Sequence, residues 1–163
     1  SESRGPDLRT DSIQARMLEH IDTLAEWDIV LDDDGSGEIA DIVAMRIEDE
    51  ALLLHFTHCK YVPGGRSRAQ VEDLYVVCGQ AQKSARWRRN LPLLLQKLIG
   101  RERRRVVAGR RSGFVRGDID ALYRVADEAH LLRPSLTIAL AQPGLSKASV
   151  SPAQLELLAS TET

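Results

Sequence analysis

The segments that decide the fold are Glu38-Ile-Ala-Asp-Ile-Val-Ala-Met45 and Ala51-Leu-Leu-Leu-His-Phe-Thr-His-Cys-Lys-Tyr61. Both are rich in apolar residues that favour strands, and only the charged stretch 46–50 separates them. Two such runs around a short polar connection predict a β-hairpin. A further β-prone run at 28–31 precedes them, across the Gly-rich turn 32–37. The centre of the fold is therefore predicted to contain three consecutive strands.

Apolar residues with helical spacing flank these strands on both sides. The spacing predicts a first helix over residues 11–27, with Asp11 or Ser12 as its N-terminal cap, and a buried strand over 135–141. Residues 106–110 fit a short strand or a helix continuation, and 62–66 and 142–144 fit a loop and a turn. The other predicted helices span 69–89, 91–105, 116–132 and 151–158. We expect an α/β fold, with helices packed around a small mixed sheet.

The size and composition limit the class of protein. The chain has 163 residues, of which 43% are hydrophobic and 28% are charged. These values fit one folded domain, expected at 11–160 behind a flexible segment at 1–10. The sequence has no apolar run near ~18 residues and no signal-peptide pattern, so we expect a cytoplasmic protein without membrane contact. Cys59 and Cys78 have no metal-binding spacing and are predicted to be core residues.

The net charge of −2 conceals two oppositely charged regions. Residues 1–63 carry 15 acidic and 5 basic side chains, whereas residues 83–116 carry 12 basic side chains and one acidic side chain. A dense basic region is typical of proteins that bind nucleic-acid phosphates. The alternative is a solvated arginine surface that balances the acidic half. The predicted nucleic-acid contacts are Arg86, Arg89, Arg103, Arg104, Arg105, Arg110 and Arg111.

Three residues of the hairpin could carry chemistry. Asp41 lies in an otherwise apolar strand, where a buried carboxylate needs an ion pair or a metal ion. In the second strand, side-chain alternation places His58 and Lys60 on one face and Cys59 on the other. An acidic metal ligand beside a strand-end lysine suits metal-dependent phosphodiester cleavage. The alternative is an internal cluster in which Asp41, His58 and Lys60 satisfy one another.

The next helix carries a polar stripe that could face the same strand ends. Gln80, Lys83, Ser84 and Trp87 follow helical i, i+3, i+4 and i+7 spacing. The alternative is a stripe on the protein surface. Small residues beside it indicate a close approach to the sheet or to a ligand.

Three competing motifs fail. The turn from Asp32 to Gly37 matches half of a calcium-binding EF-hand loop, but Val43 stands where a bidentate Glu is required. The pair His58 and Lys60 fits part of a phospholipase-D-type signature, yet Gly65 replaces its acid. The sequence contains no Gly-x-x-x-x-Gly-Lys loop for ATP.

The order helix, three strands, helix, strand, with sixteen residues between Asp41 and His58-Cys-Lys60, resembles the core of the PD-(D/E)XK nuclease superfamily. Longer phrases resemble a nuclease-like module found C-terminal to bacterial DEAD/DEAH-box helicases, which are often associated with phage (antiviral) defence. This resemblance covers about residues 27–160. The phrases are Asp33-Asp-Gly-Ser-Gly-Glu-Ile-Ala-Asp41, His58-Cys-Lys-Tyr61, Val71-Glu-Asp-Leu-Tyr75, Cys78-Gly-Gln-Ala-Gln-Lys-Ser84 and Gln142-Pro-Gly-Leu-Ser146.

The resemblance implies a restriction endonuclease-like αβββαβ core and a role for several residues. Asp41 matches the first metal-binding acid, with Glu38 as an additional acid, and Lys60 matches the motif lysine. Gln80 and Lys83 match the accessory helix residues. Glu19 or Glu26 matches the acid of the first helix.

His58 departs from this pattern, because the family usually has Asp or Glu two residues before the lysine. A neutral imidazole still binds divalent metal but favours manganese or softer ions over magnesium. The resemblance therefore implies an endonuclease that uses Mg or Mn at Asp41, His58 and Glu38, acts on nucleic acid, most plausibly DNA, and works with a helicase domain. The alternatives are a catalytically inactive nucleic-acid-binding module of the same fold and a protein-docking module with an acidic partner.

Overall fold

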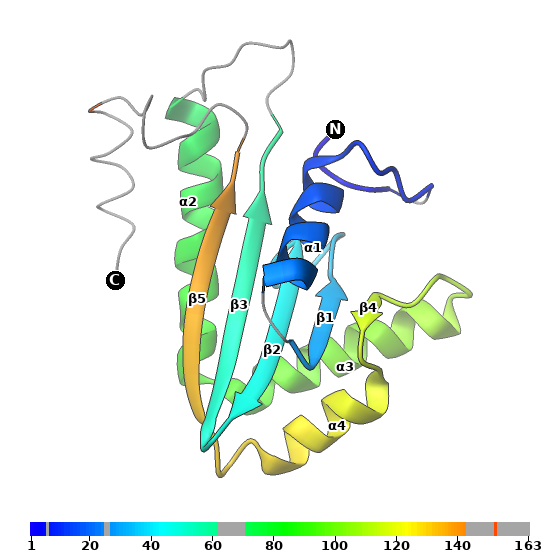
Figure 1. The fold of residues 1–163 in the computed structure, drawn as a ribbon, viewed down its shortest axis with the longest axis vertical. Helices are drawn as coiled ribbons and strands as arrows, with labels where there is room; N and C mark the ends of the chain where they lie inside the picture. The colour runs from blue at the N-terminus through cyan, green and yellow to red at the C-terminus, as the bar shows by residue number, and fades with distance from the viewer. Residues whose placement is uncertain (6, 25–26, 62–70, 143–151, 153–163) are drawn as a thin grey trace.

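The computed structural model describes residues 1–5, 7–24, 27–61, 71–142 and 152. Within them the chain is mixed α/β, with a five-stranded open sheet and four α-helices (Figure 1). The elements in chain order are α1 (Ile13–Leu24), β1 (Ile29–Asp32), β2 (Ile42–Glu48), β3 (Ala51–Cys59), α2 (Val71–Ala85), the 3-10 helix η1 (Arg86–Arg89), α3 (Leu91–Val107), β4 (Phe114–Arg116), α4 (Ile119–Glu128) and β5 (Arg133–Ala141).

The sheet has the strand order β4-β1-β2-β3-β5. All neighbouring strands are antiparallel except β3 and β5, which are parallel. At the end of the hairpin Ile42 pairs with Thr57. Because side chains alternate between the faces of a sheet, Asp41 and His58 then fall opposite each other, one position beyond this pair and on the same face. The register of β2 and β3 therefore places the candidate acid beside the candidate imidazole.

Helices cover both faces of this sheet. On one face Leu54 and Phe56 pack with Leu94 and Leu98 of α3 and with Leu122 of α4. On the other face α1 packs over β1 and β2, where its buried side chains contact the strands. Figure 1 shows α1 in front of the sheet and α2, α3 and α4 behind it. None of the helices among the described residues combines the length and apolar character that a membrane crossing needs.

The structure confirms the predicted hairpin and moves its boundaries. β2 begins at Ile42 and not at Glu38, because the preceding residues form a turn in which the Gly35 amide donates to the Glu38 carboxylate. The connection is only the turn 49–50, where Asp49 adopts a left-handed φ of 53°. Short polar residues such as Asp tolerate this conformation better than most.

The predicted helix boundaries are partly right. The Ser12 hydroxyl accepts a hydrogen bond from the Ala15 amide and caps α1 as predicted. The helix predicted over 69–89 breaks after Ala85 into η1, which turns Trp87 into the core. Helix α3 continues to Val107, so the strand alternative for 106–110 was wrong.

The last described part of the chain differs more from the predictions. The helix predicted from residue 116 begins only at Ile119, because the Asp118 carboxylate caps it by accepting from the Ala121 amide. The preceding short strand β4 was not predicted. Strand β5 exists, but it forms a sheet edge, and only Ala141 at its end is fully buried. The loop predicted at 62–66, the turn predicted at 142–144 and the helix predicted at 151–158 lie outside the described residues, apart from residues 142 and 152.

A buried ion pair joins α3 to the turn after β1. The Arg101 Nε donates to the Asp33 Oδ1 at 2.6 Å, and both side chains are almost completely buried. The same guanidinium donates to the carbonyl oxygens of Ser36 and Asp33 at 2.7 Å. The Asp33 Oδ2 accepts from the Ile39 amide at 2.9 Å. The turn is thus fixed at both ends, although its own residues are mostly polar and short.

We predict that Arg101→Ala lowers the free energy of unfolding by about 3–5 kcal/mol, because it leaves a buried carboxylate without its cation. Arg103→Ala, an exposed change on the same helix, should alter it by less than about 0.5 kcal/mol. Urea unfolding at pH 8 measures both. The loss should shrink at pH 5, where Asp33 takes up a proton more readily; equal stability of the two variants would contradict the structural role of Arg101.

Candidate functional site

Three carboxylates gather where the turn after β1 returns to the sheet. Ligand atoms of Asp34, Glu38 and Asp41 all lie within 4.8 Å of one another, so the three residues could hold a metal ion. We call this group the acid cluster. Its geometry follows from the turn, because the Asp33 amide donates to the Asp41 carbonyl at 3.0 Å and Arg101 holds the intervening chain. The cluster brings together Glu38 and Asp41, two of the three predicted ligands.

Asp41 is a buried carboxylate with a single strong hydrogen-bond donor. Its Oδ2 accepts from the Cys59 amide on β3 at 2.8 Å. Burial raises the pKa of Asp41 from 3.8 to about 7, against the lowering effect of this hydrogen bond. The charges of Glu38 and Asp34 contribute to the same rise in the pKa. A cation in the cluster would reverse this balance, since it would stabilise all three carboxylates in their charged form.

His58 lies beside Asp41, in a fixed orientation. The Ser84 hydroxyl donates its one hydrogen to the Ile39 carbonyl at 2.9 Å, so its oxygen accepts from the His58 Nε2 at 3.0 Å. Burial lowers the pKa of His58 to about 4, so the ring is neutral near pH 7. The hydrogen is therefore on Nε2, and Nδ1 carries a bare lone pair.

Two electron-pair donors consequently face each other. The His58 Nδ1 lies 3.9 Å from the Asp41 Oδ2, and among the described residues it has no hydrogen-bond partner. A buried lone pair opposite a carboxylate is unfavourable unless a proton or a cation lies between them. Neutral imidazole and carboxylate are both ligands of divalent metals. The third predicted ligand thus adjoins the acid cluster through Asp41.

Lys60 lies just beyond the end of β3. Its ammonium contacts the Glu2 carboxylate at 3.4 Å, and that carboxylate also accepts from the Tyr61 amide at 3.0 Å. Among the described residues Lys60 forms no ion pair with Asp41, so the closed Asp41 and Lys60 pair considered from the sequence is not found there. The Ser3 hydroxyl contacts Asp34, and thus the first residues of the chain lie against the site.

The remaining predicted site residues are distributed around α1 and α2. Ser84 of the predicted stripe reaches His58, and Trp87 is a core residue. Gln80 is half-buried, with its Oε1 buried and unpaired among the described residues, whereas Lys83 is exposed. Glu19 is exposed on α1, and Glu26 lies outside the described residues. Both cysteines are buried, as predicted for core residues.

The predicted nucleic-acid contacts fall into separate groups. Arg105 is engaged with the protein itself: it donates to the carbonyls of Asp32 and Asp34 at 2.8 and 3.1 Å. Arg103 and Arg104 are exposed on α3. The pairs Arg86 with Arg89 and Arg110 with Arg111 lie beyond opposite ends of α3, a helix of 17 residues and therefore about 25 Å long. The two pairs therefore lie too far apart to contact neighbouring phosphates of one short nucleic-acid site.

Sequence reasoning missed Asp34 as a member of the cluster. It noted the run Asp32-Asp-Asp34 only as a turn and as a failed calcium loop. The sequence offers no signal that separates Asp34 from Asp32 and Asp33, because Asp33 faces Arg101 of the distant helix α3 and only the resulting turn brings Asp34 to Asp41.

No protein-family model, curated protein or solved structure matches this chain.

The raised pKa of Asp41 predicts how the metal-free protein responds to pH. The folded pKa of about 7 exceeds the value of about 4 in an unfolded chain, so the folded state retains a proton that the unfolded state has lost. Protonated Asp41 therefore adds to the free energy of unfolding at acid pH, and this contribution is lost as the pH rises to 7. Between pH 5 and 8 in a chelator, the wild type should lose roughly 2–3 kcal/mol more than Asp41→Asn, which stays neutral. Urea unfolding measures this difference, and parallel pH profiles would contradict it.

Proposed function

We propose that this chain is a divalent-metal-dependent nuclease domain with a restriction endonuclease-like core, which cleaves phosphodiester bonds in DNA. The proposal includes Mg or Mn as the ion and a helicase domain, in the same or an associated chain, as the partner that supplies the substrate. A role in bacterial defence follows only from the resemblance in the sequence. The site itself supports metal binding and the cleavage reaction.

The observation that carries the proposal is the bare His58 Nδ1 opposite the Asp41 carboxylate, at the edge of the acid cluster. Carboxylate oxygens suit Mg²⁺ and Mn²⁺, and an added imidazole nitrogen shifts the preference toward Mn²⁺. The Ser84 contact fixes the ring so that the metal-binding nitrogen faces the acid. Such support for a ligand is expected of a metal centre.

Each residue of the site would have a distinct role. When bound, the ion would polarise the scissile phosphate and lower the pKa of its attacking water. Asp41, with Asp34 and Glu38, would hold the ion, and His58 would complete its ligands. The Lys60 ammonium, which cannot ligate a cation, would stabilise negative charge that develops on the phosphate. For this it would exchange its exposed partner Glu2 for substrate.

Three further features support the proposal. The order α1, β1, β2, β3, α2, β5 follows the αβββαβ pattern, with α3, β4 and α4 inserted before the last strand. The lysine and the acid cluster lie at the same end of β3, which is the arrangement the resemblance implies. The exposed arginines of α3 supply positive charge for a polyanionic substrate.

The second candidate is a catalytically inactive nucleic-acid-binding module. The observation in its favour is His58 itself, because it stands where the family pattern has an acid. With Asp41 protonated near pH 7, the metal-free site would then be a neutral buried contact. Metal binding separates the two candidates, since the inactive module needs none.

We predict that Asp41→Ala abolishes both metal binding and cleavage, whereas Lys60→Ala abolishes cleavage and leaves metal binding intact. Plasmid nicking with Mg²⁺ or Mn²⁺ measures cleavage, and calorimetric titration of Mn²⁺ measures metal binding. Lys97→Ala is the matched control, since this lysine lies over the Trp87 ring, away from the cluster. Full activity of Lys60→Ala, or a wild type that binds no Mn²⁺, would reject the nuclease.

We further predict that His58→Glu raises activity with Mg²⁺ relative to activity with Mn²⁺, because it replaces a nitrogen ligand by oxygen. The ratio of nicking rates with the two ions is the measurement. His58→Ala serves as the control, because it removes the imidazole without supplying an oxygen. An unchanged ratio in His58→Glu would show that His58 does not touch the ion.

A further inference from the structure

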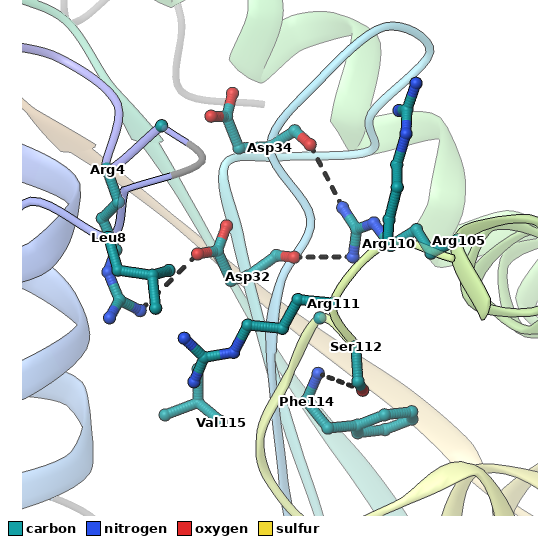
Figure 2. A pocket seen from close by; sticks show the side chains of 12 residues that line it. Arg4, Leu8, Asp32, Asp34, Arg105, Arg110, Arg111, Ser112, Phe114 and Val115 are labelled. Atoms are coloured by element: carbon teal, nitrogen blue, oxygen red, sulfur yellow. Dashed lines mark hydrogen bonds and ion pairs between the residues drawn. The ribbon is translucent and has the colours of Figure 1, made fainter. Parts of the chain in front are cut away.

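A pocket adjoins the acid cluster on the side of β4 (Figure 2). It has a volume of about 520 Å³ and is formed by the N-terminal residues, the turn after β1 and the segment that leads into β4. This volume lies within the range of small-molecule sites, about 300–1,000 Å³. Asp34 lines the pocket and also belongs to the acid cluster, so the two sites share a wall.

Four arginines line the pocket, and two of them contact other groups of the protein. Arg105 donates to backbone carbonyls of the turn, and Arg4 lies 3.6 Å from the Asp32 carboxylate. Arg110 and Arg111 are exposed and form no ion pair within the described part of the chain. In Figure 2 their side chains leave the loop in different directions. The positive charge available to a ligand is therefore that of Arg110 and Arg111.

The segment that carries these arginines is held firmly. The Gly113 carbonyl accepts from the Asp32 amide at 2.8 Å, and the Gly113 amide donates to the buried Glu102 carboxylate at 2.9 Å. A Cβ at Gly113 would lie 2.7 Å from the Asp32 carbonyl oxygen and 1.9 Å from the Arg105 Nη1. Only glycine permits this approach. The two arginines are thus presented at a fixed place beside the cluster.

The other lining residues comprise the acidic Asp32 and Asp34, small residues and an apolar part. Leu8, Phe114 and Val115 contribute side chains to the pocket, and Val115 is 44% exposed. A bare phosphate ion would leave this apolar surface in water. A nucleotide satisfies both parts of the lining, because arginines bind its phosphate while apolar and aromatic side chains pack against sugar and base.

We infer that the pocket holds one nucleotide of the bound strand, next to the scissile phosphate, with its phosphate on Arg111, the neighbouring phosphate of the strand toward Arg110, and its sugar and base against Leu8, Phe114 and Val115. The position relative to the scissile phosphate rests on the proposed nuclease function. Nucleotide binding itself does not, since the pocket arginines lie outside the acid cluster. The pocket would then select the register in which a strand enters the metal site.

The test is a calorimetric titration of the 163-residue chain with thymidine 5′-monophosphate, thymidine and inorganic phosphate. The monophosphate should bind more tightly than either fragment. The double variant Arg110→Ala/Arg111→Ala should weaken it by about 10-fold or more. Val115→Asp, which adds a carboxylate while keeping both arginines, should weaken it in the same direction.

The matched control is Arg88→Ala/Arg124→Ala, which removes two exposed arginines of η1 and α4 that do not line the pocket. It should bind the monophosphate like the wild type. With a fluorescent thymidine oligonucleotide, the salt dependence of binding should lose a slope of about one per arginine removed from the pocket, and less in the control.

The outcomes separate this inference from the proposed function. Monophosphate binding that persists in Asp41→Ala and fails in the pocket variants supports the inference, even for a wild type that cleaves no DNA. Equal losses in pocket and control variants, or binding no tighter than that of inorganic phosphate, would overturn it. So would an acidic peptide that binds through Arg110 and Arg111 more tightly than the oligonucleotide does.

Discussion

The buried ion pair between Arg101 and Asp33 is the contact on which the candidate site depends. It fixes a polar turn that has few apolar side chains of its own, and it does so from a helix packed on the opposite part of the core. The next turn of that helix supplies Arg105 to the same loop. Beyond the helix the chain returns to the loop through Gly113. The acid cluster and the arginine pocket therefore share one support, and a change in α3 would move both together.

The protonation state of Asp41 differs between the metal-free site and a site that would hold a cation. Without a cation, burial favours a protonated Asp41 and an uncharged His58, so the innermost part of the site carries little charge. Metal binding must then displace a proton, which couples the affinity for the ion to pH. The hydrogen bond that the His58 Nε2 donates to the Ser84 hydroxyl fixes the ring, so the ring need not turn or change its tautomer to become a ligand. The site is in this sense preorganised for a cation by residues that do not touch it.

The sequence was informative where structure is local. Two apolar runs around a short charged connection predicted the hairpin, whereas its register, which places Asp41 and His58 on one face, is known only from the structure. The cap at Ser12 followed from a nearby amide. Asp34 was missed because its place depends on Arg101, a residue of a distant helix that the charge pattern assigned only to a basic surface. The strand β4 was missed because three residues carry no periodicity, and it is specified by its contact with β1. Arg105 shows the same limit: charge is visible in a sequence, but its partner is not.

The arrangement of the strands also has a consequence for how the chain is made. The neighbours β1, β2 and β3 form a continuous meander, whereas both of its edges are completed by strands from later in the sequence. β5 joins β3 only after α2, α3, β4 and α4 have been synthesised, and such long-range pairing is slow. Until then the meander presents two open edges, one beside β1 and the other beside the apolar β3, and each can pair with another chain. The late segments thus close both edges only in the finished chain, and the growing chain is exposed to aggregation until they are made.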